Sequence, residues 1–149
     1  MYEIDLTNPV EFSNRMYFDQ CKQFENIDRD RIYKLMIAIK DIFSTNLGTD
    51  SLLERKTYIT YQPNNPGHAF TNDVESIIHI CQQDNNIIKW CHQFAHEFCH
   101  HLFMPQGKDY GLTWFEEVIC HVSSFYFVRV VPLIPKDMKD GQLSSYLHR

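Results

Sequence analysis

The clearest periodic pattern of apolar residues in the chain lies between residues 28 and 46. Apolar side chains recur there at helical spacings, which places them on one face of a helix. They are Ile32, Leu35, Met36, Ile39 and Phe43. Asp28 stands before this stripe and Gly48 follows it, as a start and a stop signal. The pattern predicts a helix over 28–46 that buries one face.

The segment before it also carries helix signals. Asn8 is a suitable N-cap, and Pro9 suits the first position of a helix. Phe12 and Met16 follow, four residues apart, with further apolar residues at less regular spacing. We therefore expect a first helix over residues 10–24.

Two runs in the middle of the chain are typical of β-strands. Residues 56–62 read KTYITYQ and residues 74–82 read VESIIHICQ, both rich in β-branched and aromatic side chains. The turn signal PNNPG at residues 63–67 lies between them. Because the connection is too long for a tight hairpin, we expect an antiparallel pair joined by a long loop.

Two more helices follow the predicted strands. Residues 84–86 (DNN) cap a helix over 86–103, and Thr113 opens another that reaches about Val130. The sequence thus predicts a helix-dominated α+β fold, with a small antiparallel or mixed sheet between the second and third helices. At 149 residues the chain, 1–149, is expected to form a single domain.

Composition excludes several classes of function. The formal charge is −5 and no basic run occurs, so we expect neither nucleic-acid binding nor attachment to anionic membranes. No apolar stretch is long enough to span a bilayer, and the acidic N-terminus differs from a secretory signal. The five cysteines are odd in number and lack CxxC spacing, which favours reduced thiols in the cytoplasm.

A short motif on the predicted third helix carries the chemistry. His96 and His100 frame the pattern H-E-x-x-H and, being four residues apart, share one helix face. Two imidazoles placed in this way can bind one zinc ion. Glu97 would lie close enough to act as a base on the water that the zinc activates.

A catalytic zinc site needs a third protein ligand, and two glutamates compete for this role. Thr113 and Glu116 form T-x-x-E, a capping box that would occupy Glu116 at the start of the fourth helix. Glu117 lies about 100° further round that helix and is free to point elsewhere. We therefore predict Glu117 as the third ligand and keep Glu116 as the alternative.

These residues resemble the active site of the gluzincin metallopeptidases. The resemblance rests on His96-Glu97-x-x-His100 and on the segment WFEEVIC at 114–120, and it covers residues 74–128. The short chain is also similar to the minigluzincins and the ImmA/IrrE-type peptidases. The resemblance implies a zincin-like fold and zinc-dependent peptide hydrolysis. It implies His96, His100 and Glu117 as the zinc ligands and Glu97 as the general base.

The resemblance also implies a place for a peptide or protein substrate. In such enzymes an extended peptide pairs with the edge strand of the sheet. The matching strand here is residues 76–81, with Ile78, His79 and Ile80 at its centre. We expect this strand to bind substrate through its backbone.

The chain departs from the family pattern at two points. His121 stands where thermolysin-like enzymes carry an aspartate that orients a histidine ligand, so it would support a ligand or be one itself. No downstream residue is clearly the oxyanion donor; Tyr110, Tyr146 and His148 are candidates. These departures leave two alternatives: a non-catalytic or regulatory zinc-binding module, and a helical interaction domain whose histidines coincide by chance. His92, four residues before His96, would close the site as a fourth ligand.

Overall fold

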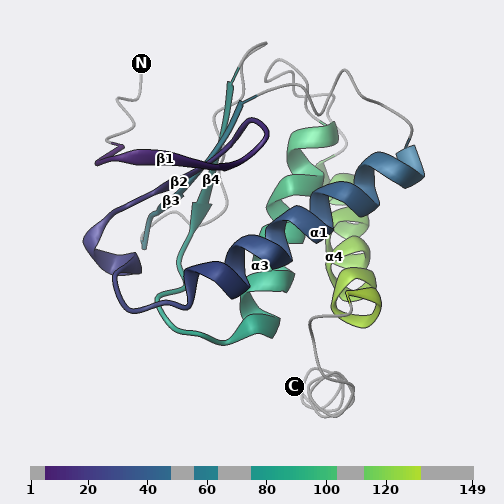
Figure 1. Ribbon diagram of the computed structural model, residues 1–149. Helices are drawn as coiled ribbons and strands as arrows, with labels where there is room; N and C mark the ends of the chain where they lie inside the picture. The colour runs from purple at the N-terminus through teal and green to yellow at the C-terminus, as the bar shows by residue number, and fades with distance from the viewer. Residues whose placement is uncertain (1–5, 48–55, 64–74, 104–112, 132–149) are drawn as a thin grey trace.

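The computed structural model describes residues 6–47, 56–63, 75–103 and 113–131 (Figure 1). These residues form one four-stranded mixed sheet and three α-helices, which confirms a mixed α+β architecture. The strands, in both chain and sheet order, are β1 (Pro9–Ser13), β2 (Met16–Asp19), β3 (Lys56–Tyr61) and β4 (Glu75–Ile80). The helices are the 3-10 turn η1 (Lys22–Phe24), α1 (Arg29–Leu47), α3 (Ile87–Phe103) and α4 (Thr113–Val130).

The predicted first helix is wrong, because the described residues after Pro9 form the β1–β2 hairpin. Asn14 and Arg15 make its two-residue turn, with Arg15 at φ 60°, in the left-handed region. Met16 and Phe18 are fully buried while Tyr17 between them is half-buried, so burial here follows a period of two. The four-residue spacing of Phe12 and Met16 gave a false helical signal.

The predicted antiparallel pairing of the two central strands is also wrong. β3 pairs in parallel with β4, with Ile59 opposite Ile78, and it pairs in parallel with β2 on its other side. Parallel neighbours need a crossover, and α1 provides it between β2 and β3. Only β1 and β2 are antiparallel. Strands β1 and β2, half of the sheet, therefore precede α1. The sequence had placed the whole sheet between the second and third predicted helices, which correspond to α1 and α3.

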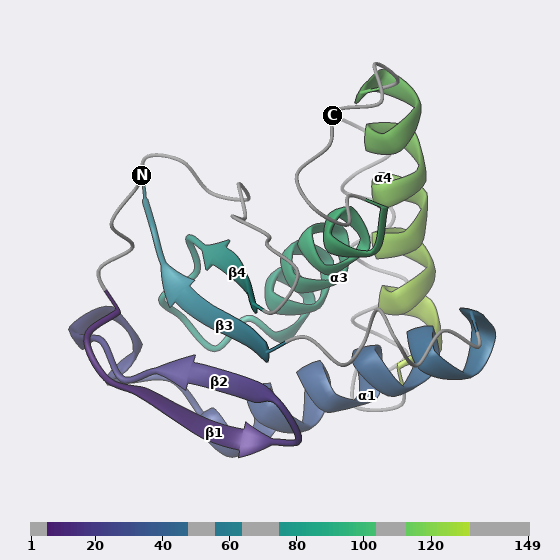
Figure 2. The ribbon, with the colours of Figure 1, turned by 90° about the horizontal axis from the view of Figure 1, so that it is seen from above.

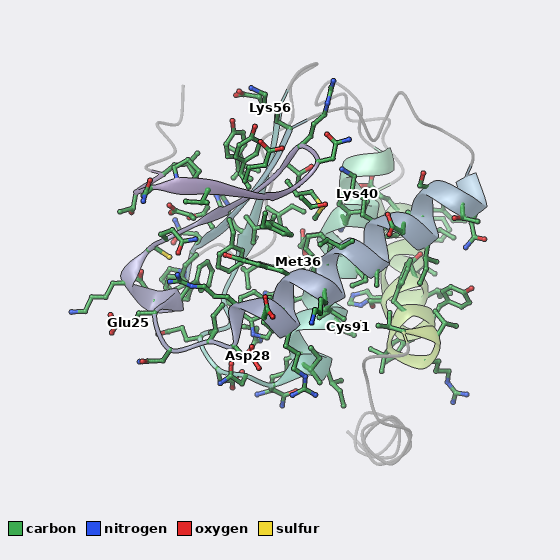
Figure 3. The ribbon with its side chains drawn as sticks, viewed as in Figure 1. Glu25, Asp28, Met36, Lys40, Lys56 and Cys91 are labelled. Atoms are coloured by element: carbon green, nitrogen blue, oxygen red, sulfur yellow. The ribbon has the colours of Figure 1, made fainter. Side chains whose placement is uncertain are left out.

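The core lies between the sheet and the helices. The stripe predicted on α1 is buried from Ile32 to Phe43, as expected for one apolar helix face. Met36 on α1 and Cys91 on α3, both labelled in Figure 3, have no exposed surface. Trp90 is fully buried among Phe18 and Phe24, and its indole N–H donates to the Asp84 carbonyl at 2.7 Å.

The helix that carries the H-E-x-x-H motif begins where its cap signals predict. The backbone N–H of Lys89 donates to Asn86 Oδ1 at 3.2 Å, and the N–H of Asn86 donates to Asp84 Oδ1 at 3.1 Å. In Figure 2 α3 lies between β4 on one side and α4 on the other, and it contacts both. Within the described part of the chain, no helix is long and apolar enough to cross a membrane.

Candidate metal centre

Helix α3 brings the two motif histidines together. His96 and His100 lie one turn apart on the face that meets α4, and their Nε2 atoms are 3.1 Å from each other. Each ring is largely buried, with side-chain exposures of 12% and 19%. The opposite face of this turn packs into the core through Phe94 and Phe98. This packing holds both imidazoles toward one point.

Helix α4 supplies the third group. Glu117 Oε1 lies 3.0 Å from His100 Nε2, and Glu117 Oε2 lies 3.4 Å from His96 Nε2. The two helices are held together at this level by Cys99 and Cys120, both buried, with Cys99 Sγ 3.6 Å from Ser123 Oγ. One nitrogen from each histidine and one Glu117 oxygen lie within 4.8 Å of one another.

The spacing of these donor atoms fits a zinc ion. Zinc–nitrogen and zinc–oxygen bonds near 2.0–2.1 Å in a tetrahedron place neighbouring ligand atoms about 3.3 Å apart. The two Nε2 atoms are 3.1 Å apart, and each lies near that distance from one oxygen of Glu117: Oε1 is 3.0 Å from His100 and Oε2 is 3.4 Å from His96. These are two different oxygens, and with a single oxygen the three donor atoms lie within 4.8 Å of one another. Two imidazole nitrogens and one carboxylate are also a donor set of catalytic zinc sites, which leave a fourth position open. His96, His100 and Glu117 could therefore hold a metal ion, and their donor types suit zinc.

Glu116 takes a part that the capping hypothesis did not foresee. Its Oε1 lies 2.6 Å from His100 Nδ1, and its side chain is only 17% exposed. A carboxylate that accepts the proton of Nδ1 leaves Nε2 of the same ring as the lone-pair donor toward a metal. Glu116 therefore orients His100. The proposed capping partner, the Thr113 side chain, lies outside the described residues.

Glu97 lies beside the three donors, and its carboxyl group is buried. Its Oε1 is 3.7 Å from His96 Nε2, and its Oε2 has no hydrogen-bond partner among the described residues. Burial, with a smaller contribution from the charge of Glu117, raises the pKa of Glu97 to about 8. Burial also lowers the pKa of His96 to about 4, helped by the neighbouring histidines, so this ring is neutral at pH 7. A neutral imidazole is the form that binds a metal.

These shifts predict how the stability of the metal-free protein depends on pH. Between pH 7 and 8 Glu97 is largely protonated when folded and ionised when unfolded, while His96 is largely neutral in both states. Folding therefore takes up most of a proton, and the free energy of unfolding falls by roughly 1 kcal/mol over this window. The Glu97→Gln variant should show little of this fall when urea unfolding is followed in the presence of a chelator. An equal fall in both proteins would contradict the burial of a protonated Glu97.

No protein-family model, curated protein or solved structure matches this chain.

The other predicted histidines lie next to the three donors. His121 Nε2 is 3.7 Å from Glu117 Oε2, and the His121 ring centroid is 4.5 Å from that of His96. The ring of His92 stacks at 6.4 Å from His96 and also packs 5.3 Å from Phe125. His121 thus lies close enough to assist the site. The side chain of His101, and the residues Tyr110, Tyr146 and His148, lie outside the described part of the chain.

The predicted substrate strand is at one end of the sheet and contacts α3. β4 is the last strand in the sheet order and pairs with β3. Ile78 and Ile80 are fully buried in the core and His79 is half-buried. The two isoleucine side chains therefore pack and cannot contact a ligand, so only the backbone of this strand remains a candidate for pairing with a peptide.

A cleft of about 280 Å³ adjoins the metal centre and includes residues that the sequence analysis did not select. Glu97, His96 and His121 line it at the metal centre. The other described lining residues are Gln82, Lys89, His92 and Gln93. The available signal was helical spacing, because Lys89, His92, Gln93 and His96 fall on one face of α3 at i, i+3, i+4 and i+7.

Proposed function

We propose that the protein is a zinc-dependent metallopeptidase of gluzincin type, with a zincin-like domain that hydrolyses peptide bonds in peptide or protein substrates. The observation that carries the proposal is the convergence of His96 Nε2, His100 Nε2 and the Glu117 carboxylate at separations of 3.0 to 3.4 Å, with Glu97 beside them. Bound there, a zinc ion supplies the Lewis acidity that polarises a peptide carbonyl and acidifies a water molecule.

Glu97 moves the proton in this proposal. Glu97 lines the same cleft, and its Oε2 is buried without a partner among the described residues, so no hydrogen bond competes when this oxygen takes a proton from the attacking water. Burial raises the pKa of Glu97 to about 8 in the metal-free protein, and the positive charge of a bound zinc ion would lower it, so that the carboxylate form is present to act as the base. The same atom then delivers the proton to the leaving amine, which requires Glu97 to hold it only briefly.

His121 completes the catalytic group in this proposal. It lines the same cleft as Glu97, and its exposed imidazole lies beside His96. A ring N–H at this place can donate a hydrogen bond to the substrate carbonyl oxygen as negative charge develops on it. The chain thereby would have an oxyanion donor on α4 itself, one turn after Glu117.

The protein is proposed to work in a reducing compartment such as the cytoplasm. All five cysteines are free, and Cys21, Cys91, Cys99 and Cys120 are buried. Free buried thiols are ordinary in a reducing environment.

One observation favours a second function, a non-catalytic or regulatory zinc-binding module. His121 Nε2 lies 3.7 Å from Glu117 Oε2, so His121 is near enough to the three donors to be considered as a fourth ligand. A fourth protein ligand closes a zinc site and makes it structural.

The two functions are separated by measuring zinc content and peptide cleavage on the same protein. We expect cleavage of a fluorescence-quenched peptide library that stops after chelation and returns when one equivalent of zinc is added. Zinc binding without any cleavage would favour the regulatory module. If neither zinc binding nor cleavage occurs after reconstitution, both functions are wrong.

A further inference from the structure

Every described residue that lines the cleft beside the metal centre has a polar or charged group, although carbon atoms of these residues form the larger part of the lining surface. Its side chains are amides, imidazoles, one ammonium and one carboxylate, and no aliphatic or benzenoid side chain is among those described. Its volume of about 280 Å³ is near the lower end for ligand sites.

The charge of the cleft changes along helix α3. At the metal end stands Glu97, the only carboxylate among the described lining residues, and it is buried. At the other end stands Lys89, which is exposed, and its ammonium forms no ion pair with any described residue. Lys89 therefore makes the outer end of the cleft positive.

The groups between these ends are hydrogen-bonding groups in a fixed arrangement. The side-chain amide of Gln93 accepts from the backbone N–H of Cys81 at 3.2 Å and donates to Cys81 Sγ at 3.0 Å. This contact ties α3 to the residue that follows β4. Burial, with a smaller contribution from the charge of His121, lowers the pKa of His92. The amides and this ring add polarity to the cleft but no negative charge.

The distance between the two ends sets where a substrate group would bind. Lys89 and His96 are seven residues apart on α3, which is roughly 10 Å along the helix axis. An extended peptide covers this length in about three residues. A group about three residues from the scissile bond would therefore meet Lys89.

We propose that this cleft selects substrates with a carboxylate about three residues from the scissile bond, and that Lys89 is the residue that recognises it. The carboxylate belongs either to an acidic side chain or to the end of the peptide. This inference rests on the proposed metallopeptidase function and names the substrate class of the same site.

The test uses peptide hydroxamates, which bind through the zinc, and measures their affinity for the zinc-loaded protein by calorimetry. Three ligands share an Ala-Ala tail and end in glutamine amide, glutamic acid amide or glutamine with a free carboxylate. We expect one or both carboxylate ligands to bind about threefold to tenfold more tightly than the neutral one, as for a solvent-exposed ion pair. The ligand with the advantage identifies the source of the carboxylate, and the advantage should shrink with added salt.

Matched variants assign the effect to one residue. Lys89→Gln should remove the advantage and leave binding of the neutral hydroxamate unchanged, while Lys89→Arg should keep it. Lys34→Gln makes the same charge change on α1, in an exposed pair with Asp30 (side-chain exposures 66% and 88%), and should have no effect.

Three outcomes would overturn the inference. Equal affinity of all three ligands would show that the cleft does not select a carboxylate, while the proposed peptidase function would stand. An advantage that survives Lys89→Gln would show that another residue recognises the carboxylate. Failure of all three hydroxamates to bind would overturn the proposed function and, with it, the inference about its substrate.

Discussion

Replacing Glu97 with glutamine is expected to lower kcat/KM for peptide hydrolysis by about a thousandfold or more, with zinc binding retained. The amide has nearly the same shape but cannot take a proton from water, and general-base catalysis is worth roughly 10²–10⁴-fold. Because Oε2 of Glu97 has no partner among the described residues, the substitution breaks no hydrogen bond at that atom. Cleavage of a quenched peptide and metal content by mass spectrometry should be measured on the same preparation.

Glu25→Gln is the matched control, because Glu25 is an exposed glutamate after η1. It should keep full activity and full zinc content. Glu97→Gln should also remain folded, since it removes a carboxyl group whose pKa burial raises to about 8. If Glu97→Gln cleaved peptides as fast as the parent protein, the observed cleavage would come from another residue or from a contaminant, and Glu97 would not be the base.

The second large effect is expected when Glu117 is replaced by alanine, which should weaken zinc binding by about a hundredfold to a thousandfold. One of three protein ligands is lost, and structural zinc sites of four ligands are worth roughly 10–16 kcal/mol, or about 2.5–4 kcal/mol per ligand. Glu117 is half-exposed, with 51% of its side chain accessible, so its removal should leave the core intact. Competition with a chelating dye measures the affinity directly.

Glu116→Ala tests which glutamate binds the metal. Glu116 contacts Nδ1 of His100 on the side away from the other donors, so its loss should weaken zinc binding only about 10–100-fold. The ratio of the two effects is the decisive quantity. A larger loss for Glu116→Ala than for Glu117→Ala would exchange their roles and contradict the site described above.

Much of the fold was predictable wherever local signals agreed with each other. On α1 the apolar stripe, the acidic start and the glycine after it all indicated one helix, and the structure has it over Arg29–Leu47. On α3 the Asp84 and Asn86 caps fixed the first residue of the helix. In the β1–β2 hairpin the signals conflicted. Pro9 suits a helix start and an edge strand equally, and only the pairing of β1 with β2, and of β2 with β3, decided between them.

Strand direction lay beyond the reach of local pattern. KTYITY and ESIIHI would fit a parallel or an antiparallel neighbour equally well, since side chains alternate in both. After β2 the chain passes through α1 as a crossover and then enters β3. Strand β3 therefore runs in the same direction as β2 and pairs with it in parallel. The pairing of β3 with β4 is then part of a sheet whose order no single segment specifies.

The sequence by itself determined the chemistry that is available: His96 and His100 share a face because a helix repeats every 3.6 residues, and Glu97 accompanies them. Only the tertiary structure decided the division of labour between the two glutamates. Packing of α4 on α3 sets Glu117 against both Nε2 atoms and Glu116 against Nδ1 of His100. The same packing brings His121 of α4 to the cleft that Lys89 of α3 also lines. Helical periodicity is a property of neighbours in the chain, whereas contact between α3 and α4 depends on how the whole core is filled.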